Sequence, residues 1–209
     1  MFTQVHEWDG MTPREETLAA LQALIDSGKV RYVGVSDYAA WQRMKALWIA
    51  ERARLPSFVS QQIYRPLQER SVEYGLVPLA VDQGLGMLVW NPLSGGWLSG
   101  KYRRDRTAPE GSRQLTGWDV PPVCDEERLY DTVDLLAAVA ERHGVSAAHV
   151  ALAWPLTRPT VSSVLIGART DEQLAGNLEA ADLVLSADEL ARLEQVSRRT
   201  CCIRTGIGR

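Results

Sequence analysis

Short apolar runs alternate with amphipathic stretches along this chain. The first amphipathic stretch opens with Thr12-Pro13-Arg14-Glu15, where a Thr N-cap, a Pro at N1 and a Glu at N3 predict a helix start with a capping box. Apolar residues then recur at helical spacing as far as Gly28, a typical C-terminal stop. The run Tyr32-Val33-Gly34-Val35 follows and predicts a buried strand that ends at Ser36-Asp37.

The same order of strand and helix repeats through the rest of the sequence. Further strands are expected over about 58–62, 87–90 and 161–166, and helices over about 39–53, 69–83, 125–143, 170–178 and 186–196. A further helix is expected to be N-capped by Ser146, and Ser186 with Glu189 predicts a second capping box. A long irregular stretch, Pro92 to Cys124, separates the two halves of the pattern.

Short apolar strands that alternate with helices through brief connections indicate a parallel sheet covered by helices. Two architectures fit this pattern, a doubly wound sheet and a (β/α)8 barrel. No G-x-G-x-x-G follows a strand, because Gly84-Leu85-Gly86 precedes its strand and can only be a turn. The doubly wound alternative therefore loses its strongest support, and we expect an α/β chain of the TIM-barrel type.

Composition narrows the classes of function. Of the 209 residues, 45% are hydrophobic and 23% are charged, and the net charge is -3, so no basic surface favours nucleic acid or an anionic membrane. No apolar run approaches the roughly 20 residues of a membrane span, and the first residues lack a signal-peptide core. We expect a cytoplasmic protein with neither a nucleic-acid nor a membrane partner.

The three cysteines have spacings that fit neither a disulfide framework nor a zinc site. Cys201 and Cys202 are adjacent, and Cys124 has no His or Cys close by in the sequence. We expect reduced thiols and no metal site.

Polar residues follow the expected strands at the end where a barrel carries its chemistry. They are His6, Ser36-Asp37, Gln61-Gln62, Trp90-Asn91 and Gly167-Ala168-Arg169. A histidine, two hydrogen-bonding pairs, an indole and an arginine could together hold an aromatic, amide-bearing, phosphorylated ligand. A nicotinamide dinucleotide is such a ligand.

Several ordered motifs give the chain a family resemblance. They are residues 28 to 37, Gln61-Gln62-Ile63-Tyr64, Trp90-Asn91-Pro92-Leu93 followed by Gly100-Lys101-Tyr102, and residues 167 to 177. In this order they closely resemble the aldo-keto reductase family, in its branch of bacterial oxidoreductases related to potassium-channel β subunits. The resemblance implies a (β/α)8 barrel that binds NADP(H) and reduces aldehydes or ketones to alcohols by hydride transfer. Of that barrel this chain would cover about strands 4 to 8.

The resemblance also assigns the residues around the nicotinamide. His6 matches the histidine that orients and polarises the substrate carbonyl, and Ser36 and Gln61 match residues that bind the carboxamide. Asp37 stands where many members have Asn or Arg, so its ionised side chain can accept a hydrogen bond but cannot donate one. Trp90 matches the aromatic residue that stacks on the nicotinamide ring.

The resemblance places the remaining matched residues along the pyrophosphate and at the other phosphates of the cofactor. They are Asn91, Pro92, Leu93, Lys101, Arg113, Gly167, Arg169, Gln173 and Asn177. Lys101 and Arg113 would reach the phosphates, and Arg169 would favour NADPH over NADH through the 2'-phosphate. Gly176 departs from the family's usual Glu, which contacts the adenine end.

Two ends of the chain depart from the family. The family's catalytic Asp, Tyr and Lys come from strands before His6, and no tyrosine here stands in the family's Asp-x4-Tyr context with a Lys one strand further on. We therefore expect an N-terminally truncated barrel whose open edges tend to associate and whose turnover is weak or absent. Residues 1–197 would form the partial barrel, and 198–209 an atypical tail produced by a frameshift.

Three functional interpretations fit the sequence. The first is an NADPH-dependent carbonyl reductase that lacks its N-terminal part. The second is a non-catalytic cofactor-binding or interaction protein, and the third is an inactive gene remnant. In the first case the partner is a small-molecule carbonyl substrate, whose identity the sequence does not give.

Overall fold

The structure is a computed structural model that describes residues 1–104, 110–112, 123 and 125–198. Three groups of residues discussed above lie outside these ranges: Arg113, the cysteines Cys124, Cys201 and Cys202, and the tail from residue 199 onward. The cofactor contact expected of Arg113, the state of the thiols and the frameshifted tail therefore stay predictions.

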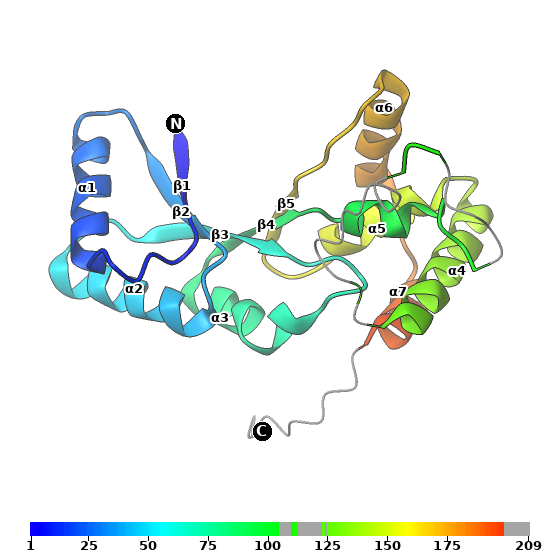
Figure 1. Ribbon diagram of the computed structural model, residues 1–209, viewed down its shortest axis with the longest axis horizontal. Coiled ribbons are helices and arrows are strands. Elements are labelled where there is room, and N and C mark those ends of the chain that lie inside the picture. Colours follow the sequence, from blue (N-terminus) through cyan, green and yellow to red (C-terminus); the bar gives the residue numbers. More distant parts are fainter. Residues whose placement is uncertain (105–109, 113–122, 124, 199–209) are drawn as a thin grey trace.

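One sheet of five parallel strands runs through the molecule. Its strands are β1 (Phe2–His6), β2 (Tyr32–Ser36), β3 (Phe58–Tyr64), β4 (Gly86–Trp90) and β5 (Val161–Val164). They lie side by side in the order of the sequence, and each neighbouring pair is parallel. The sheet is open at β1 and β5 (Figure 1), so the expected α/β class is confirmed as an incomplete barrel that is not closed.

The helices fall into two groups. The first group joins the first four strands and consists of α1 (Arg14–Asp26), α2 (Ala40–Ala53) and α3 (Leu76–Gln83). The second group gathers beyond β4 and β5 (Figure 1) and consists of α4 (Glu126–His143), α5 (Ala147–Leu156), α6 (Asp171–Glu179) and α7 (Ala187–Ser197). Among the helices of the described ranges, none is both long and apolar enough to cross a membrane.

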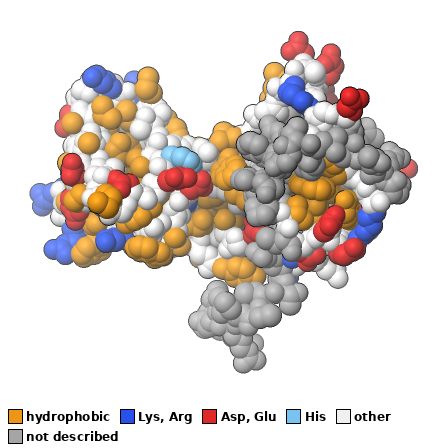
Figure 2. Space-filling model, viewed as in Figure 1, with side chains coloured by type: hydrophobic (Ala, Val, Ile, Leu, Met, Phe, Trp, Pro, Cys, Tyr) orange, Lys and Arg blue, Asp and Glu red, His pale blue; other side chains and the backbone are white. Residues whose placement is uncertain are grey.

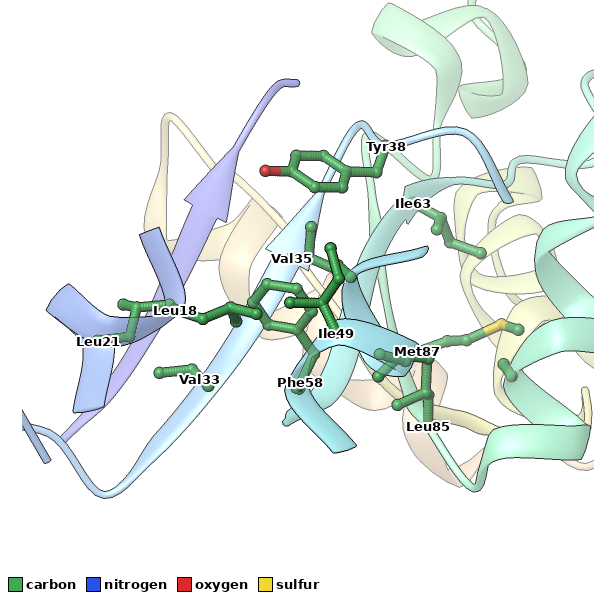
Figure 3. Close-up of a cluster of buried hydrophobic side chains, with 14 of the residues drawn as sticks. Leu18, Leu21, Val33, Val35, Tyr38, Ile49, Phe58, Ile63, Leu85 and Met87 are labelled. Atoms are coloured by element: carbon green, nitrogen blue, oxygen red, sulfur yellow. The ribbon is translucent and has the colours of Figure 1, made fainter. Parts of the chain in front are cut away.

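Each group of helices has its own hydrophobic core. In the first, leucines of α1 and aliphatic residues of α2 pack on one face of the sheet, as Figure 3 shows for Leu18, Val33, Val35, Ile49 and Phe58. The second is built from α4, α5 and α7 around the fully buried ring of Trp154. Each large apolar side chain buried in this way contributes roughly 1.5–3 kcal/mol.

The first helix begins differently from the prediction. Its N-cap is Pro13 without a side-chain hydrogen bond, so the capping box expected at Thr12 is wrong. The Thr12 hydroxyl instead donates to the carboxylate of Asp9, which also accepts from the Met11 amide at 2.8 Å. These bonds, the one from Thr12 first, lower the pKa of Asp9. Because the Thr12 hydroxyl binds the Asp9 carboxylate, it does not cap the end of the helix.

Two other boundaries also differ. The single helix expected over 69–83 is a 3-10 helix, Ser71–Tyr74, followed by α3, and the two are divided at Gly75. Glycine is a weak helix former, and a Cβ there would stand 3.2 Å from that of Ala40 in α2. The last strand ends at Val164, two residues early. The N-cap of α5 is Ser146, as predicted, but its hydroxyl lies 2.6 Å from His149 Nδ1 and makes no capping bond.

At α7 the capping-box prediction is confirmed. The Ser186 hydroxyl accepts from the backbone N–H of Glu189, and the Glu189 carboxylate accepts from that of Ser186 at 2.9 Å. The two N–H groups at this helix end are thereby paired.

Candidate functional site

The C-terminal edge of the sheet carries an unusual backbone conformation at three strands. Glu7, Asp37 and Asn91 directly follow β1, β2 and β4, and their φ angles are 61, 52 and 48°. Left-handed conformations of this kind cost non-glycine residues about 1–3 kcal/mol each and concentrate at functional sites. This edge is therefore the candidate site, as the polar strand ends of the sequence predicted.

His6 and Asp37 lie together at this edge. The Nδ1 of His6 stands 3.8 Å from Oδ2 of Asp37, and its Nε2 stands 3.9 Å from Oε1 of Glu7. Both separations are too long for hydrogen bonds, and the imidazole is exposed. An imidazole N–H of His6 is thus available to a ligand that enters from solvent.

Ser36 lies directly beside His6, because the two residues are paired in the register of β1 and β2. Its side chain is buried, and its Oγ has no hydrogen-bond partner among the described residues. A buried hydroxyl left in this state costs roughly 1–3 kcal/mol. It could therefore bind an incoming amide, which is the role that the family resemblance assigns to it.

Gln61 lies on the opposite face of the sheet, against the helices. Its Oε1 accepts from the guanidinium of Arg43 in α2, and its Nε2 donates to the carbonyl oxygen of Leu76 at 2.8 Å. Both ends of its amide are therefore occupied by the protein. The structure does not bring Gln61 to His6, so its binding role stays a prediction that this placement does not support.

The neighbouring Gln62 has the placement expected of a site residue. It pairs in register with Ser36, and paired residues of parallel strands point to the same face of the sheet. The sequence reasoning missed it because the motif contains two adjacent glutamines, which must point to opposite faces. A count of alternating positions back from the buried Ile63, on the helix-covered face, could have separated them.

Trp90 ends β4 on the same face as Ser36 and Gln62. Its ring lies 4.9 Å from that of Tyr64, the residue paired with it in β3, at an interplanar angle of 36°. The indole is half-buried, and its Nε1 has no hydrogen-bond partner in the described part of the chain. Its ring is thus fixed from one side by Tyr64.

A cavity of about 500 Å³ lies beyond the ends of β4 and β5. This volume is within the range of small-molecule sites, roughly 300–1,000 Å³. It brings together eight predicted cofactor residues: Asn91, Pro92, Leu93, Lys101, Gly167, Arg169, Gln173 and Asn177. His6, Ser36, Asp37, Gln61 and Trp90 do not line this cavity.

One wall of the cavity is the segment after β4. The Oδ1 of Asn91 accepts from the N–H of Gly95 at 2.8 Å, which folds the segment back on itself. Gly96 has a φ of 97°, and a Cβ there would stand 3.1 Å from Nζ of Lys101. The glycine leaves room for the lysine ammonium at this wall.

The opposite wall is the segment after β5 together with α6. The backbone N–H of Arg169 donates to Oε1 of Gln173 at 2.9 Å, and Asn177 donates to the Gly167 carbonyl oxygen at 3.4 Å. Thr170 caps α6 by accepting from the N–H of Gln173 at 3.3 Å. These bonds hold the segment on the N-terminal end of the helix, which favours anions.

The electrostatics of the two walls favour an anionic ligand. Within the described ranges, neither Lys101 nor Arg169 has an acidic partner within salt-bridge distance. The first turn of α6 carries Asp171 and Glu172, which partly offset the positive helix end. In the same described ranges, no group of three His, Cys, Asp or Glu side chains could hold a metal ion.

Comparison with known proteins agrees with this geometry. The model of the Aldo/keto reductase family matches residues 2–198. The chain is 34% identical over 193 residues to an uncharacterized oxidoreductase, YrpG, of Bacillus subtilis, which covers 92% of this chain and 57% of that protein. It is 35% identical over 198 residues to the L-glyceraldehyde 3-phosphate reductase of Escherichia coli K12, covering 91% and 56% respectively.

A third relative comes from a plant. A probable voltage-gated potassium channel subunit beta of Arabidopsis thaliana is 34% identical over 200 residues, covering 91% of this chain and 60% of that subunit. The chain thus spans little more than half the length of these relatives. Because the family model matches nearly all of it, and its sheet and strand ends have the order that the motifs imply, the chain belongs to the aldo/keto reductase family.

Proposed function

We propose that this chain is the cofactor-binding part of an NADP(H)-dependent oxidoreductase that reduces aldehydes or ketones to alcohols. The observation that carries the proposal is the cavity beyond β4 and β5, which gathers eight residues predicted from widely separated motifs. Two of them, Lys101 and Arg169, are cations on opposite walls. A dinucleotide with a pyrophosphate and a 2'-phosphate matches such a pair in charge.

The residues present fit a nicotinamide dinucleotide at both ends. Lys101, Arg169 and the end of α6 would hold the phosphates, with Asn91 and Asn177 beside them. The buried Ser36 hydroxyl and the side chain of Gln62, on the same face as Trp90, would receive the carboxamide. When bound, NADPH supplies the hydride for the reduction.

His6 is the residue of this chain that would act on the substrate. Its exposed imidazole stands at the same edge as Ser36 and can donate a hydrogen bond to a carbonyl oxygen. Such a bond draws electron density from the carbonyl carbon and orients it for attack. The carboxylates of Asp37 and Glu7 flank the ring, at 3.8 and 3.9 Å from its two nitrogens.

The proton that completes the alcohol needs another donor. None of the six tyrosines in the sequence has the family's Asp-x4-Tyr context with a Lys one strand further on, and general acids contribute about 10²–10⁴-fold to such steps. We therefore propose that the 209-residue polypeptide binds NADPH but reduces carbonyl compounds slowly. The substrate class is a small aldehyde or ketone, in keeping with the reductase of L-glyceraldehyde 3-phosphate among the relatives.

The open sheet supplies the second part of the proposal. Within the described residues, the strands β1 and β5 each have one neighbouring strand, so each leaves an edge of the sheet without a second strand. Exposed edges of this kind pair readily with other strands. We propose that these edges associate with further strands, from a second copy or from another polypeptide, in a cytoplasmic setting.

Cofactor titration tests the proposed function directly. Binding of NADPH and NADH to the purified chain is followed by quenching of tryptophan fluorescence. We expect saturable binding that is at least tenfold tighter for NADPH, because only NADPH carries the 2'-phosphate that Arg169 can meet. Absence of saturable binding overturns the cofactor assignment, and rapid reduction of a small aldehyde overturns the assignment of weak turnover.

A further inference from the structure

The ring of Tyr64 packs against that of Trp90, the residue that the family resemblance assigns to stacking on the nicotinamide. Tyr64 and Trp90 are paired in the register of β3 and β4, and their ring centroids are 4.9 Å apart at an interplanar angle of 36°. Stacked and tilted aromatic pairs at such distances attract one another beyond the effect of burial alone. The plane of the Trp90 indole is therefore set by the Tyr64 ring.

The hydroxyl of Tyr64 reaches a different segment. It lies 2.7 Å from Oγ of Ser94, which belongs to the segment that leaves β4, and it accepts from Nε2 of Gln68 at 3.1 Å. Gln68 also donates to Oγ of Ser94. Ser94 and Gln68 are both buried. One tyrosine thus contacts both the end of β4 and the segment that follows it.

The backbone of Ser94 requires this support. Its φ of 53° lies in the left-handed region, which is unfavourable for a serine. Strained conformations of this kind persist where the surroundings determine them more than once. Here the N–H of Ser94 donates to the Asn91 carbonyl oxygen at 2.9 Å, while the hydroxyl is held by Tyr64 and Gln68.

The segment held in this way is a wall of the cavity. Asn91, Pro92, Leu93, Gly95 and Gly96 all line it, and the N–H of Gly95 donates to Oδ1 of Asn91. A shift of Ser94 would displace the two glycines that follow it. The position of this wall therefore depends on the contact between Tyr64 and Ser94.

We propose that Tyr64 is a positioning residue for the cofactor. Its ring sets the plane of Trp90, and its hydroxyl, through Ser94, holds residues 91–96 in the conformation that forms the cavity wall. This inference rests on the proposed function, because it assigns the positioned groups to the nicotinamide and pyrophosphate. The adenosine 2'-phosphate is expected at Arg169, on the wall that Tyr64 does not touch.

Tyr64→Phe tests the hydroxyl while it keeps the ring. Binding of NADPH and of 2',5'-ADP, which lacks the nicotinamide, is measured by calorimetry for wild type, Tyr64→Phe, Ser94→Ala and the double variant. Tyr32→Phe is the matched control, because Tyr32 is 60% exposed on β2. A lost hydrogen bond corresponds to roughly two- to tenfold in affinity.

We expect Tyr64→Phe and Ser94→Ala each to weaken NADPH about fivefold, to leave 2',5'-ADP within about twofold, and to be non-additive in the double variant. In the cofactor-free chain, hydrogen exchange at the Gly95 amide should accelerate about fivefold in both variants. Tyr32→Phe should change neither quantity.

The outcomes separate the two proposals. If wild type binds NADPH and Tyr64→Phe binds it equally well, the positioning role is overturned and the proposed function stands. Equal weakening of both ligands also overturns it, since a general structural defect acts on both walls. If wild type binds neither ligand, the proposed function is overturned, and the positioning role falls with it.

Discussion

Arg43 of α2 donates a hydrogen bond to Oε1 of Gln61 in β3, and both side chains are buried. Burial lowers the pKa of Arg43 to about 10, against the opposing effect of the Asp37 carboxylate, so the guanidinium stays charged at neutral pH. The amide oxygen of Gln61 is thus the acceptor of a buried cation. This contact joins the helix layer to the strand whose other face carries the candidate site.

The first prediction follows from this contact. Replacing Gln61 by Leu leaves the Arg43 guanidinium buried without that acceptor, so the free energy of unfolding should fall by about 3 kcal/mol. Urea denaturation of wild type and variant, followed by circular dichroism, measures the change. The double change Gln61→Leu with Arg43→Met should recover part of the loss. A double variant less stable than Gln61→Leu alone would contradict this account.

The second prediction concerns the neighbouring glutamine. Gln62→Ala should weaken NADPH binding about fivefold, because Gln62 shares the face of Ser36 and Trp90. Its stability should stay within about 0.5 kcal/mol of wild type, as for most changes away from a packed core. Fluorescence titration and urea denaturation give the two quantities. Unchanged NADPH affinity in Gln62→Ala would remove this residue from the site.

The two glutamines show where sequence reasoning reaches its limit. The strand predicted over about 58–62 ends two residues before β3 does, and the family resemblance chose Gln61 from the motif at 61–64. Which of two adjacent side chains faces the site depends on the alternation of side chains along the strand. The pairing of β2 with β3 is irregular at Val33/Gly34, opposite the start of β3 at Phe58. That irregularity disturbs a count carried forward from Phe58, whereas a count back from Ile63 does not cross it and separates Gln61 from Gln62.

Other parts of the fold also fall into features that a local sequence pattern predicts and features that contacts from outside the element decide. The parallel order of the strands and the capping box at Ser186 depend on local patterns, and both were predicted from the sequence. The predicted start of α1 was wrong because the carboxylate of Asp9, outside the helix, accepts the hydrogen bond of the Thr12 hydroxyl. The division at Gly75 depends on the approach of Ala40, a contact between separate helices that no local pattern contains.

The third prediction addresses the cations of the cavity. Arg169→Gln should weaken NADPH at least tenfold and leave NADH within about twofold, because a charge-assisted bond to the 2'-phosphate is lost. Lys101→Gln should weaken both cofactors, since the pyrophosphate is common to them. Lys45→Gln, an exposed lysine on α2, makes the same change of charge away from the cavity and should alter neither affinity. Equal effects of Lys45→Gln and Lys101→Gln would reduce the cavity's role to net charge.

The fourth prediction concerns pH and rests on Glu73. Burial alone would raise the pKa of this carboxyl, but hydrogen bonds from Arg70 and Arg65 outweigh it and hold the pKa below its ordinary value. Oε2 accepts from Nη2 of Arg70 at 2.8 Å and Oε1 from Nη2 of Arg65 at 2.9 Å. A pKa lowered by folding means that the stabilisation is complete above the unfolded-state value of about 4.3 and is lost as the pH falls below it.

Glu73→Gln should therefore be less stable than wild type by about 2 kcal/mol at pH 7, with the difference shrinking between about pH 5 and pH 3. Urea denaturation across this range measures it. Glu51→Gln is the control, because Glu51 is exposed and forms no ion pair within the described ranges. Its stability should follow wild type at every pH. A Glu73→Gln difference that stays constant down to pH 3 would show that lost packing, and not the charge held by the two arginines, accounts for the effect.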